Sequence, residues 1–250
     1  MQANWLEALV RLLDEAQRVF VFTGAGISTR SNIPDFRGPQ GIYKDRSPVY
    51  FQEFVASEAS RREYWAFKLE GYGAFRDAQP NAAHRALVTL EKLRKLNLLA
   101  TQNVDGLHQA AGTSHERLVE LHGSNRSVEC LECGRQESPE RCMKEFEASG
   151  EPPKCIACGG WMKPAVVMFG QGLDMGRLRK AQACSRAADL VLALGSSLVV
   201  TPASDLPLAG VQAGAKYVII NQGATPQDRL ATLRIEGDVV DYLAAAVARL

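Results

Sequence analysis

The sequence predicts an α/β fold in which a parallel sheet carries helices on both faces and a smaller lobe is inserted in the chain. Short apolar runs alternate with helical periodicities along most of the 250 residues, as expected for a parallel sheet covered on both sides. Between about residues 125 and 163 this alternation stops, and a polar stretch rich in cysteine, proline and glycine takes over. We interpret that stretch as an insert rather than a terminal domain.

Hydrophobic periodicity predicts the elements of the sheet and its helices in order. Residues 1–17 are amphipathic at helical spacing, and Asn4 followed by Glu7 resembles a capping box at the start of that helix. Apolar runs predict strands at 19–22, 98–101, 190–194 and 217–220. Helices are expected at 51–58, 61–70, 87–96, 177–188, 202–213 and 239–250. Gly71 and Gly73 are interpreted as turn signals.

Composition indicates an ordinary globular protein. Hydrophobic residues make up 46% and charged residues 23% of the chain, and the net charge of +1 gives no reason to expect nucleic acid as a partner. No apolar run reaches the length of a membrane span, and charges interrupt residues 1–17 where a signal peptide would be apolar. We therefore expect a cytoplasmic, reducing location, with no membrane partner and a monomeric state.

Four of the six cysteines form two CxxC pairs inside the insert. These are Cys130, Cys133, Cys155 and Cys158. Four thiolates at this spacing suit one closed tetrahedral zinc site, which is structural because no coordination position stays open. Disulfides are the alternative, and a reducing compartment disfavours them. A zinc ribbon that binds nucleic acid is disfavoured by the many glutamates of the insert. Cys142 and Cys184 are expected to be buried or indifferent thiols.

Three strand ends carry polar or glycine-rich turns of the kind that nucleotides favour. The first strand runs into Gly24 and Gly26, where backbone N–H groups suit a diphosphate, although Thr29 stands where the dinucleotide fingerprint needs a third glycine. Gln102, Asn103 and Asp105 follow the second strand, where an ordinary Asx turn is the alternative. Gly195, Ser196 and Ser197 follow the third strand, and Asn221 ends the fourth. Such ends meet at one edge of a parallel sheet.

Histidines supply the candidate bases. His122 precedes the insert, and an imidazole titrates near neutral pH, which suits a general base. His84 and His115 are expected on helical or loop surfaces, and His108 lies where a loop passes into a helix.

Taken in order, these motifs resemble the sirtuin family of NAD-dependent protein lysine deacylases, of bacterial or archaeal type. The matching segments are Gly24-Ala-Gly-Ile-Ser28, Ile33-Pro-Asp-Phe-Arg37, Thr101 to His108, Leu121-His-Gly123, the two CxxC pairs and Gly195-Ser-Ser-Leu198. They span nearly the whole chain. The resemblance implies a Rossmann-type NAD-binding domain from residues 1–38, 80–124 and 164–250. It also implies a small lobe made of a helical part, 39–79, and a zinc ribbon, 125–163.

The resemblance assigns roles residue by residue. It implies that the NAD pocket is lined by Gly24, Ala25, Gly26, Ile33, Asp35, Phe36, Arg37, Gln102, Asn103, Asp105, Gly195, Ser196, Ser197, Asn221 and Val239. His122 is similar to the family's general base, and Asn103 is the second catalytic residue. The substrate is an acylated lysine in an extended peptide, which is expected to pair with Val167, Phe169, Gly170, Leu198 and Val199 by strand addition.

The expected activity transfers an acetyl or longer apolar acyl group from lysine to the ADP-ribose part of NAD and releases nicotinamide. The alternatives are an NAD glycohydrolase or ADP-ribosyltransferase, which share the nicotinamide cleavage, and a non-catalytic nucleotide-binding module. Three residues depart from the family pattern at positions that bear on the expected activity. Asn32 replaces a glycine, Gln171 replaces an acid, and Lys68 replaces the arginine of members that prefer acidic acyl groups. Because lysine lacks the bidentate fork of arginine, no strong preference for acidic acyl groups is expected.

Overall fold

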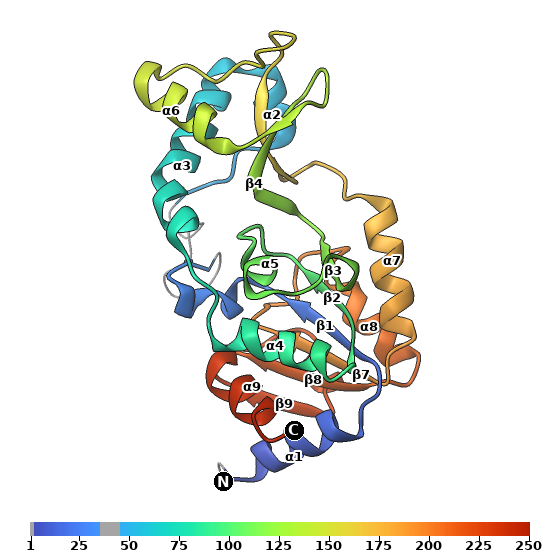
Figure 1. The fold of residues 1–250 in the computed structure, drawn as a ribbon. Helices are drawn as coiled ribbons and strands as arrows, with labels where there is room; N and C mark the ends of the chain where they lie inside the picture. Colours follow the sequence, from blue (N-terminus) through green and yellow to red (C-terminus); the bar gives the residue numbers. More distant parts are fainter. Residues whose placement is uncertain (1–2, 36–45) are drawn as a thin grey trace.

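The computed structural model describes residues 3–35 and 46–250 and contains two lobes (Figure 1). The large lobe is built on a six-stranded parallel sheet with the strand order β3-β2-β1-β7-β8-β9. The strands are β1 (Val19–Thr23), β2 (Leu96–Thr101), β3 (Leu118–Glu120), β7 (Leu190–Leu194), β8 (Lys216–Asn221) and β9 (Leu233–Glu236). The order reverses between β1 and β7, so a crevice is expected beyond the carboxyl ends of these two strands.

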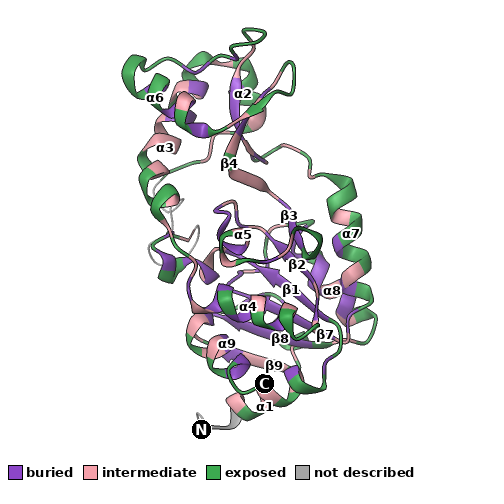
Figure 2. Cartoon of the chain, in the orientation of Figure 1, coloured by how far each residue is buried: buried purple, intermediate pink, exposed green. Residues whose placement is uncertain are grey.

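Helices cover both faces of this sheet, as the sequence predicts. One face packs against α1 (Ala3–Glu15), α4 (Ala82–Lys92) and α9 (Val239–Val247), and the other packs against α7 (Met175–Arg186) and α8 (Asp205–Gln212). The central strands are buried along their whole length, whereas the outer faces of the helices are exposed (Figure 2). Shorter elements are α5 (Leu107–Ala111), η1 (Ala25–Ile27), η2 (Thr29–Ser31), η3 (His115–Arg117) and η4 (Asp228–Leu230).

The small lobe combines two distant segments of the chain. Its sheet has the order β5-β4-β6, with β4 (Gly123–Cys130) antiparallel to both β5 (Gln136–Glu137) and β6 (Met162–Val166). The helices α2 (Phe51–Ala56), α3 (Glu58–Asp77) and α6 (Pro139–Ser149) pack beside it. Its core includes the fully buried Phe54 and Trp65, and the Trp65 Nε1–H donates to the Met162 carbonyl oxygen at 3.3 Å.

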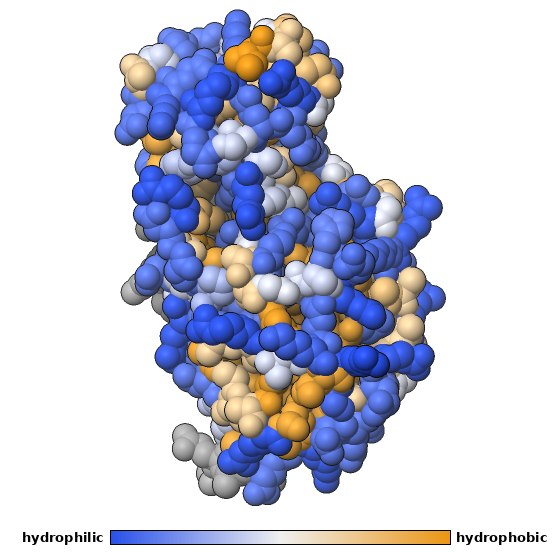
Figure 3. All heavy atoms as spheres, in the orientation of Figure 1, coloured by the Kyte–Doolittle hydropathy of each residue, from blue (hydrophilic) through white to orange (hydrophobic). Residues whose placement is uncertain are grey.

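Hydrophilic side chains cover most of the face of both lobes seen in Figure 3, and apolar ones gather there in small groups. Among the described residues, no helix has the length and apolar character needed to cross a membrane.

The predicted architecture is confirmed, and some boundaries are wrong. Helix α1 already includes Ala3, so Asn4 lies inside it and is not the N-cap. Gly71 and Gly73 do not end a helix, because both lie within the 20-residue α3. Glycine costs about 1 kcal/mol in a helix interior, and the packing of Tyr64 and Trp65 in the small-lobe core offsets that cost.

Element ends also differ from the predictions. Helix α8 begins at Asp205 rather than at residue 202, and the short strands β3 and β9 add an edge to each side of the predicted sheet. The predicted domain boundaries stay predictions.

His84 is buried, so its predicted place on a surface is wrong, and His108 is buried as well. His84 on α4 is fully buried and His108 on α5 is 1% exposed, and their ring centroids are 4.9 Å apart. Burial, and secondarily the nearby Arg85, lowers the pKa of His84 from 6.5 to about 4. Burial also lowers the pKa of His108 well below its usual value. Both imidazoles are therefore neutral at neutral pH.

This neutral pair predicts acid lability. An unfolded histidine binds its proton near pH 6.5, whereas folded His84 stays neutral to about pH 4. The unfolded state therefore binds more protons in this window, and the free energy of unfolding falls as the pH is lowered from 6.5 toward 4. His84 accounts for up to about 3 kcal/mol of this loss. Urea unfolding across the range measures it. A His84→Gln variant should show a shallower pH dependence, whereas replacing the exposed His115 in the same way should not. Equal slopes in all three proteins would contradict the prediction.

Candidate active site

The turn after β1 packs backbone against backbone on the turn after β7. The Gly24 N–H donates to the Leu194 carbonyl oxygen at 3.0 Å, and the Gly26 N–H donates to the Gly195 carbonyl oxygen at 2.9 Å. A Cβ atom on Gly26 would lie 2.8 Å from the Gly195 Cα, so no side chain fits there. Gly195 itself has a φ of +60°, which glycine adopts without strain. The two strand ends thus form one closely packed floor at the point where the strand order reverses.

A buried polar cluster adjoins this floor. The Asn103 Nδ2 group donates to the Gly24 carbonyl oxygen at 3.1 Å and to Ser28 Oγ at 3.2 Å. Ser28 Oγ donates to Asp105 Oδ2 at 2.7 Å. Burial raises the pKa of Asp105, and hydrogen bonds from Leu107 N–H and Ser28 Oγ oppose that rise. These contacts fix the amide of Asn103 in one orientation.

One acceptor of this amide is left buried without a partner in the part of the chain that the structure describes. Asn103 is 5% exposed, and its Oδ1 atom has no hydrogen-bond partner among the described residues. A buried amide oxygen without a partner costs about 1–3 kcal/mol. Because Asn103 lines the cleft, a hydroxyl group of a ligand bound there would supply the missing hydrogen bond.

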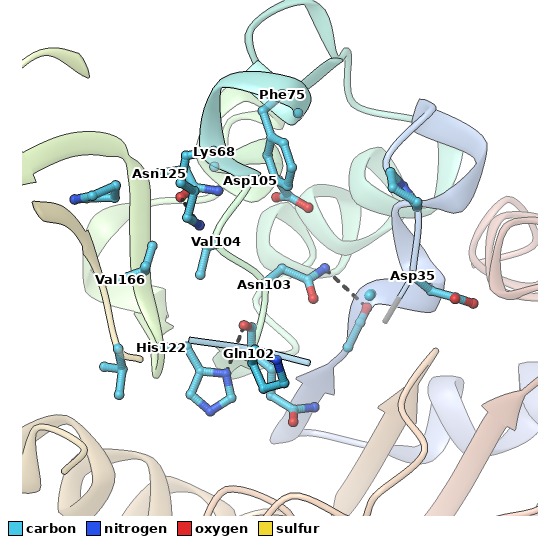
Figure 4. Close-up of a pocket in the computed structure, with 18 of the residues that line it drawn as sticks. Asp35, Lys68, Phe75, Gln102, Asn103, Val104, Asp105, His122, Asn125 and Val166 are labelled. Carbon is cyan, nitrogen blue, oxygen red and sulfur yellow. Dashed lines mark hydrogen bonds between the residues drawn. The ribbon is translucent and has the colours of Figure 1, made fainter. Parts of the chain in front are cut away.

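His122 lies beyond β3 and is held by the polypeptide backbone. Its Nδ1 atom lies 3.1 Å from the Gln102 carbonyl oxygen, which only accepts hydrogen bonds, so Nδ1 carries the proton and the lone pair is on Nε2 (Figure 4). The Gln102 Nε2 group in turn donates to Ser196 Oγ at 2.9 Å. Residues after β2, β3 and β7 therefore orient one another.

These residues line a single cleft of about 1480 Å³ between the lobes. The predicted site residues on its wall are Gly24, Ala25, Gly26, Asp35, Gln102, Asn103, Asp105, His122, Val167, Phe169, Gly170, Gly195, Ser196, Ser197, Asn221 and Val239. Among the described residues, three predicted members do not line it: Ile33 and Leu198 are buried, and Val199 is 52% exposed. Phe36 and Arg37 lie outside the described residues. The roles of all these residues stay predictions.

Sequence reasoning missed Ser28 as a support of the site, and it named Lys68 only as a departure that bears on acyl preference, without its contacts. Ser28 is fully buried beneath Asn103, and nothing in its local sequence indicates that contact. Lys68 on α3 donates to Asn125 Oδ1 at 3.1 Å and lies beside the rings of Tyr64 and Phe67. Burial, with the nearby Lys163, lowers the pKa of Lys68 to about 8. Figure 4 shows Lys68, Asn125 and Val104 along the same side of the cleft.

The four CxxC cysteines converge in the small lobe. Their Sγ atoms all lie within 4.8 Å of one another, with 3.4 Å between those of Cys130 and Cys158 and 3.8 Å between those of Cys133 and Cys155. Zn–S bonds of about 2.3 Å in a tetrahedron require S···S separations near 3.8 Å, so the donor set fits one zinc ion.

Backbone geometry supports this metal site. Gly134 and Gly159 each have a positive φ, and each N–H donates back to the carbonyl oxygen of the first cysteine of its pair. Backbone N–H groups, from Cys133 and Ala157 respectively, lower the pKa values of Cys130 and Cys155. The turns bring the four sulfur atoms toward a common centre, and the lowered pKa values favour the thiolate form of Cys130 and Cys155.

Known proteins match this chain along most of its length. The model of the Sir2 family matches residues 24–202. The chain belongs to the Sir2 family. It is 41% identical over 238 residues to the NAD-dependent protein deacetylase 1 of Bradyrhizobium diazoefficiens, covering 95% of this chain and 93% of that protein. It is 42% identical to the NAD-dependent protein deacetylase of Thermotoga maritima, covering 95% of each chain.

Solved Sir2 structures have the same fold. One, described as Sir2 with a p53 peptide and NAD+, superposes with a TM-score of 0.89 at 38% identity and covers 98% of each chain. Another, described as bound to a propionylated peptide, superposes with a TM-score of 0.88 at 36% identity and covers 98% of each chain.

Two departures from the family pattern are accommodated locally. Asn32 adopts a φ of 62° and ψ of 23°, a left-handed conformation that asparagine tolerates better than most residues, so the expected turn survives. The Oε1 atom of Gln171 accepts a hydrogen bond from the Met168 N–H at 3.1 Å and so closes the turn after β6.

The close glycine floor yields a first prediction for this site. Gly26→Ala forces the two turns apart and should lower the free energy of unfolding by about 1–3 kcal/mol and weaken NAD binding. Thermal unfolding and calorimetric titration with NAD measure the two effects. Gly73→Ala is the matched control, because nothing lies within 4 Å of a Cβ at this helical position. Unchanged NAD affinity in Gly26→Ala would show that the floor does not contact the dinucleotide.

The thiolate cluster yields a second prediction. Elemental analysis should find about one zinc per chain, and chelation should unfold the small lobe because metal binding contributes directly to its folding. Cys155→Ser should lose the metal, whereas Cys184→Ser, outside the cluster, should retain it. A folded, zinc-loaded Cys155→Ser protein would refute the assignment.

Proposed function

We propose that the chain is an NAD-dependent protein lysine deacylase that removes acetyl or longer apolar acyl groups and releases nicotinamide, O-acyl-ADP-ribose and free lysine. The observation that carries the proposal is the shared cleft. There, the oriented imidazole of His122 and the unsatisfied Oδ1 of Asn103 lie on neighbouring strand ends above a glycine floor. The relatives at about 40% identity bear the name NAD-dependent protein deacetylase, which supports the same activity.

The residues of the cleft fit NAD as co-substrate. The floor at Gly24, Gly26 and Gly195 allows a diphosphate to approach the backbone closely, and Ser196 and Asn221 lie on the same wall. Asn103 Oδ1 would accept a hydrogen bond from a ribose hydroxyl. When bound, NAD supplies the ADP-ribosyl group that gives up nicotinamide and accepts the acyl group.

His122 then acts as the general base. Because its Nδ1–H is held by the Gln102 carbonyl oxygen, Nε2 is the atom that takes the proton from a ribose hydroxyl, so that the neighbouring ribose hydroxyl can attack the acyl carbon. The backbone carbonyl oxygen of Gln102 orients the imidazole, and its side chain contacts Ser196 on the glycine floor.

The peptide is proposed to lie in extended form between the segment after β6 and the segment after β7. The Val167 N–H donates to the His122 carbonyl oxygen at 2.8 Å, and the Phe169 carbonyl oxygen accepts from the Phe51 N–H at 2.9 Å. These bonds tie the peptide-binding segment to both lobes. Because recognition uses the backbone, the acyl-lysine, rather than the flanking sequence, should dominate selectivity.

An apolar acyl chain suits the wall opposite His122. Lys68 lies against aromatic rings, and its lowered pKa of about 8 reflects an environment that disfavours charge.

We also propose a cytoplasmic location, supported by the convergence of four free cysteines as metal ligands, which needs a reducing compartment.

Incubation with NAD and an acetylated peptide tests the function. We expect nicotinamide, free lysine peptide and O-acetyl-ADP-ribose in equal amounts, with butyryl peptide also accepted and succinyl peptide disfavoured. His122→Ala should lose at least about a hundredfold in deacylation while retaining nicotinamide exchange. Nicotinamide release without deacylation would instead indicate a glycohydrolase or ADP-ribosyltransferase. Intact NAD with every peptide would indicate a binding module.

A further inference from the structure

We propose that the buried His108 is a positioning residue that acts through the hydroxyls of Thr23 and Thr101 to fix the backbone of Asn103. This inference rests on the proposed function only for the role of Asn103 in catalysis. The chain of contacts itself is independent of that role. None of the three residues lies on the wall of the cleft, so each acts from beneath it.

The contacts run without a gap from α5 to the site. His108 Nε2 lies 3.1 Å from Thr23 Oγ1, Thr23 Oγ1 donates to Thr101 Oγ1 at 2.8 Å, and the Asn103 N–H donates to Thr101 Oγ1 at 3.0 Å. Thr23 is fully buried, Thr101 is 2% exposed and His108 is 1% exposed. In the dry interior, hydrogen bonds of this kind are strong and specify one arrangement.

The donors and acceptors of these groups indicate the direction of each hydrogen bond in the series. With the Thr23 hydroxyl donating to Thr101, we infer that His108 Nε2 donates to Thr23 and that the lone pair of His108 is on Nδ1. At the other ring, the Asn81 N–H donates to His84 Nδ1 at 3.3 Å, which leaves the proton of His84 on Nε2.

The two atoms left over are complementary. His84 Nε2 is a donor and His108 Nδ1 is an acceptor, both are buried, and neither has a hydrogen-bond partner among the described residues. Their rings are neighbours, with centroids 4.9 Å apart. A direct contact after a small ring rotation, or one bridging water, would join them. The series of hydrogen bonds would then extend from the N-cap of α4 to Asn103.

This arrangement works only with neutral rings in single tautomers. A proton on His108 Nδ1 would remove its acceptor and set two N–H donors against each other across the ring pair. The desolvation that keeps both rings neutral is therefore part of the positioning, because it holds the hydroxyl of Thr23 pointed at Thr101. Asn103 then has a fixed backbone as well as a fixed side chain.

Substitution of Thr23 tests this series of hydrogen bonds kinetically. Thr23→Val keeps the shape and removes the hydroxyl, and we expect kcat for nicotinamide release to fall about tenfold with KM for the peptide unchanged. Thr23→Ser should recover most of the rate. Thr113→Val is the matched control, because Thr113 is also buried and its hydroxyl has no partner among the described residues. An equal loss in Thr23→Val and Thr113→Val, or full activity in Thr23→Val, would overturn the proposal.

Nitrogen-15 NMR of the wild-type histidines provides a readout without catalysis or mutation. At neutral pH we expect both His84 and His108 to be neutral with the proton on Nε2. A His108 proton on Nδ1, or a charged ring, would overturn the chain even if the enzyme is active. If the wild type fails to release nicotinamide with any peptide, the proposed function is wrong. The tautomers of His84 and His108 still decide whether the hydrogen-bond series exists.

Discussion

The close contact between the turns after β1 and β7 is the constraint on which the rest of the site depends. Gly24, Gly26 and Gly195 bring two backbones together with no room for side chains. Because this contact lies where the strand order reverses, it sets the floor of the cleft and the positions of the neighbouring strand ends. Asn103 is tied to that floor through the Gly24 carbonyl oxygen, and Gln102 through Ser196. The imidazole of His122 is oriented only after Gln102 is in position.

Two kinds of support surround this floor. From below, buried hydroxyls and neutral imidazoles fix the end of β2, and from the side the small lobe supplies Lys68 and the segment after β6. The hydroxyls and imidazoles below carry no charge at neutral pH, and burial lowers the pKa of Lys68 at the side. Buried charges would need partners of opposite sign, whereas neutral donors and acceptors leave the cleft free to bind a charged dinucleotide without competing ion pairs at Asn103.

Much of this could be predicted from the sequence because the decisive signals are local. A strand followed by Gly24 and Gly26, two CxxC pairs, and polar residues directly after a strand each occupy a few adjacent positions. The burial of His84, the contact of Ser28 with Asp105 and the short edge strands β3 and β9 could not, because their causes lie far along the chain. Ser28 and Asp105, for example, are 77 positions apart, and only the folded sheet makes them neighbours.

The split origin of the small lobe has a consequence for biosynthesis. Trp65 on α3 packs in a core whose other half comes from β4, α6 and β6, and its indole bonds to a carbonyl 97 residues later in the chain. During translation, the aromatic face of α3 therefore leaves the ribosome well before its partners exist. The small lobe can fold only after the second cysteine pair has left the ribosome. Metal binding and burial of this apolar face are therefore coupled and occur late in translation.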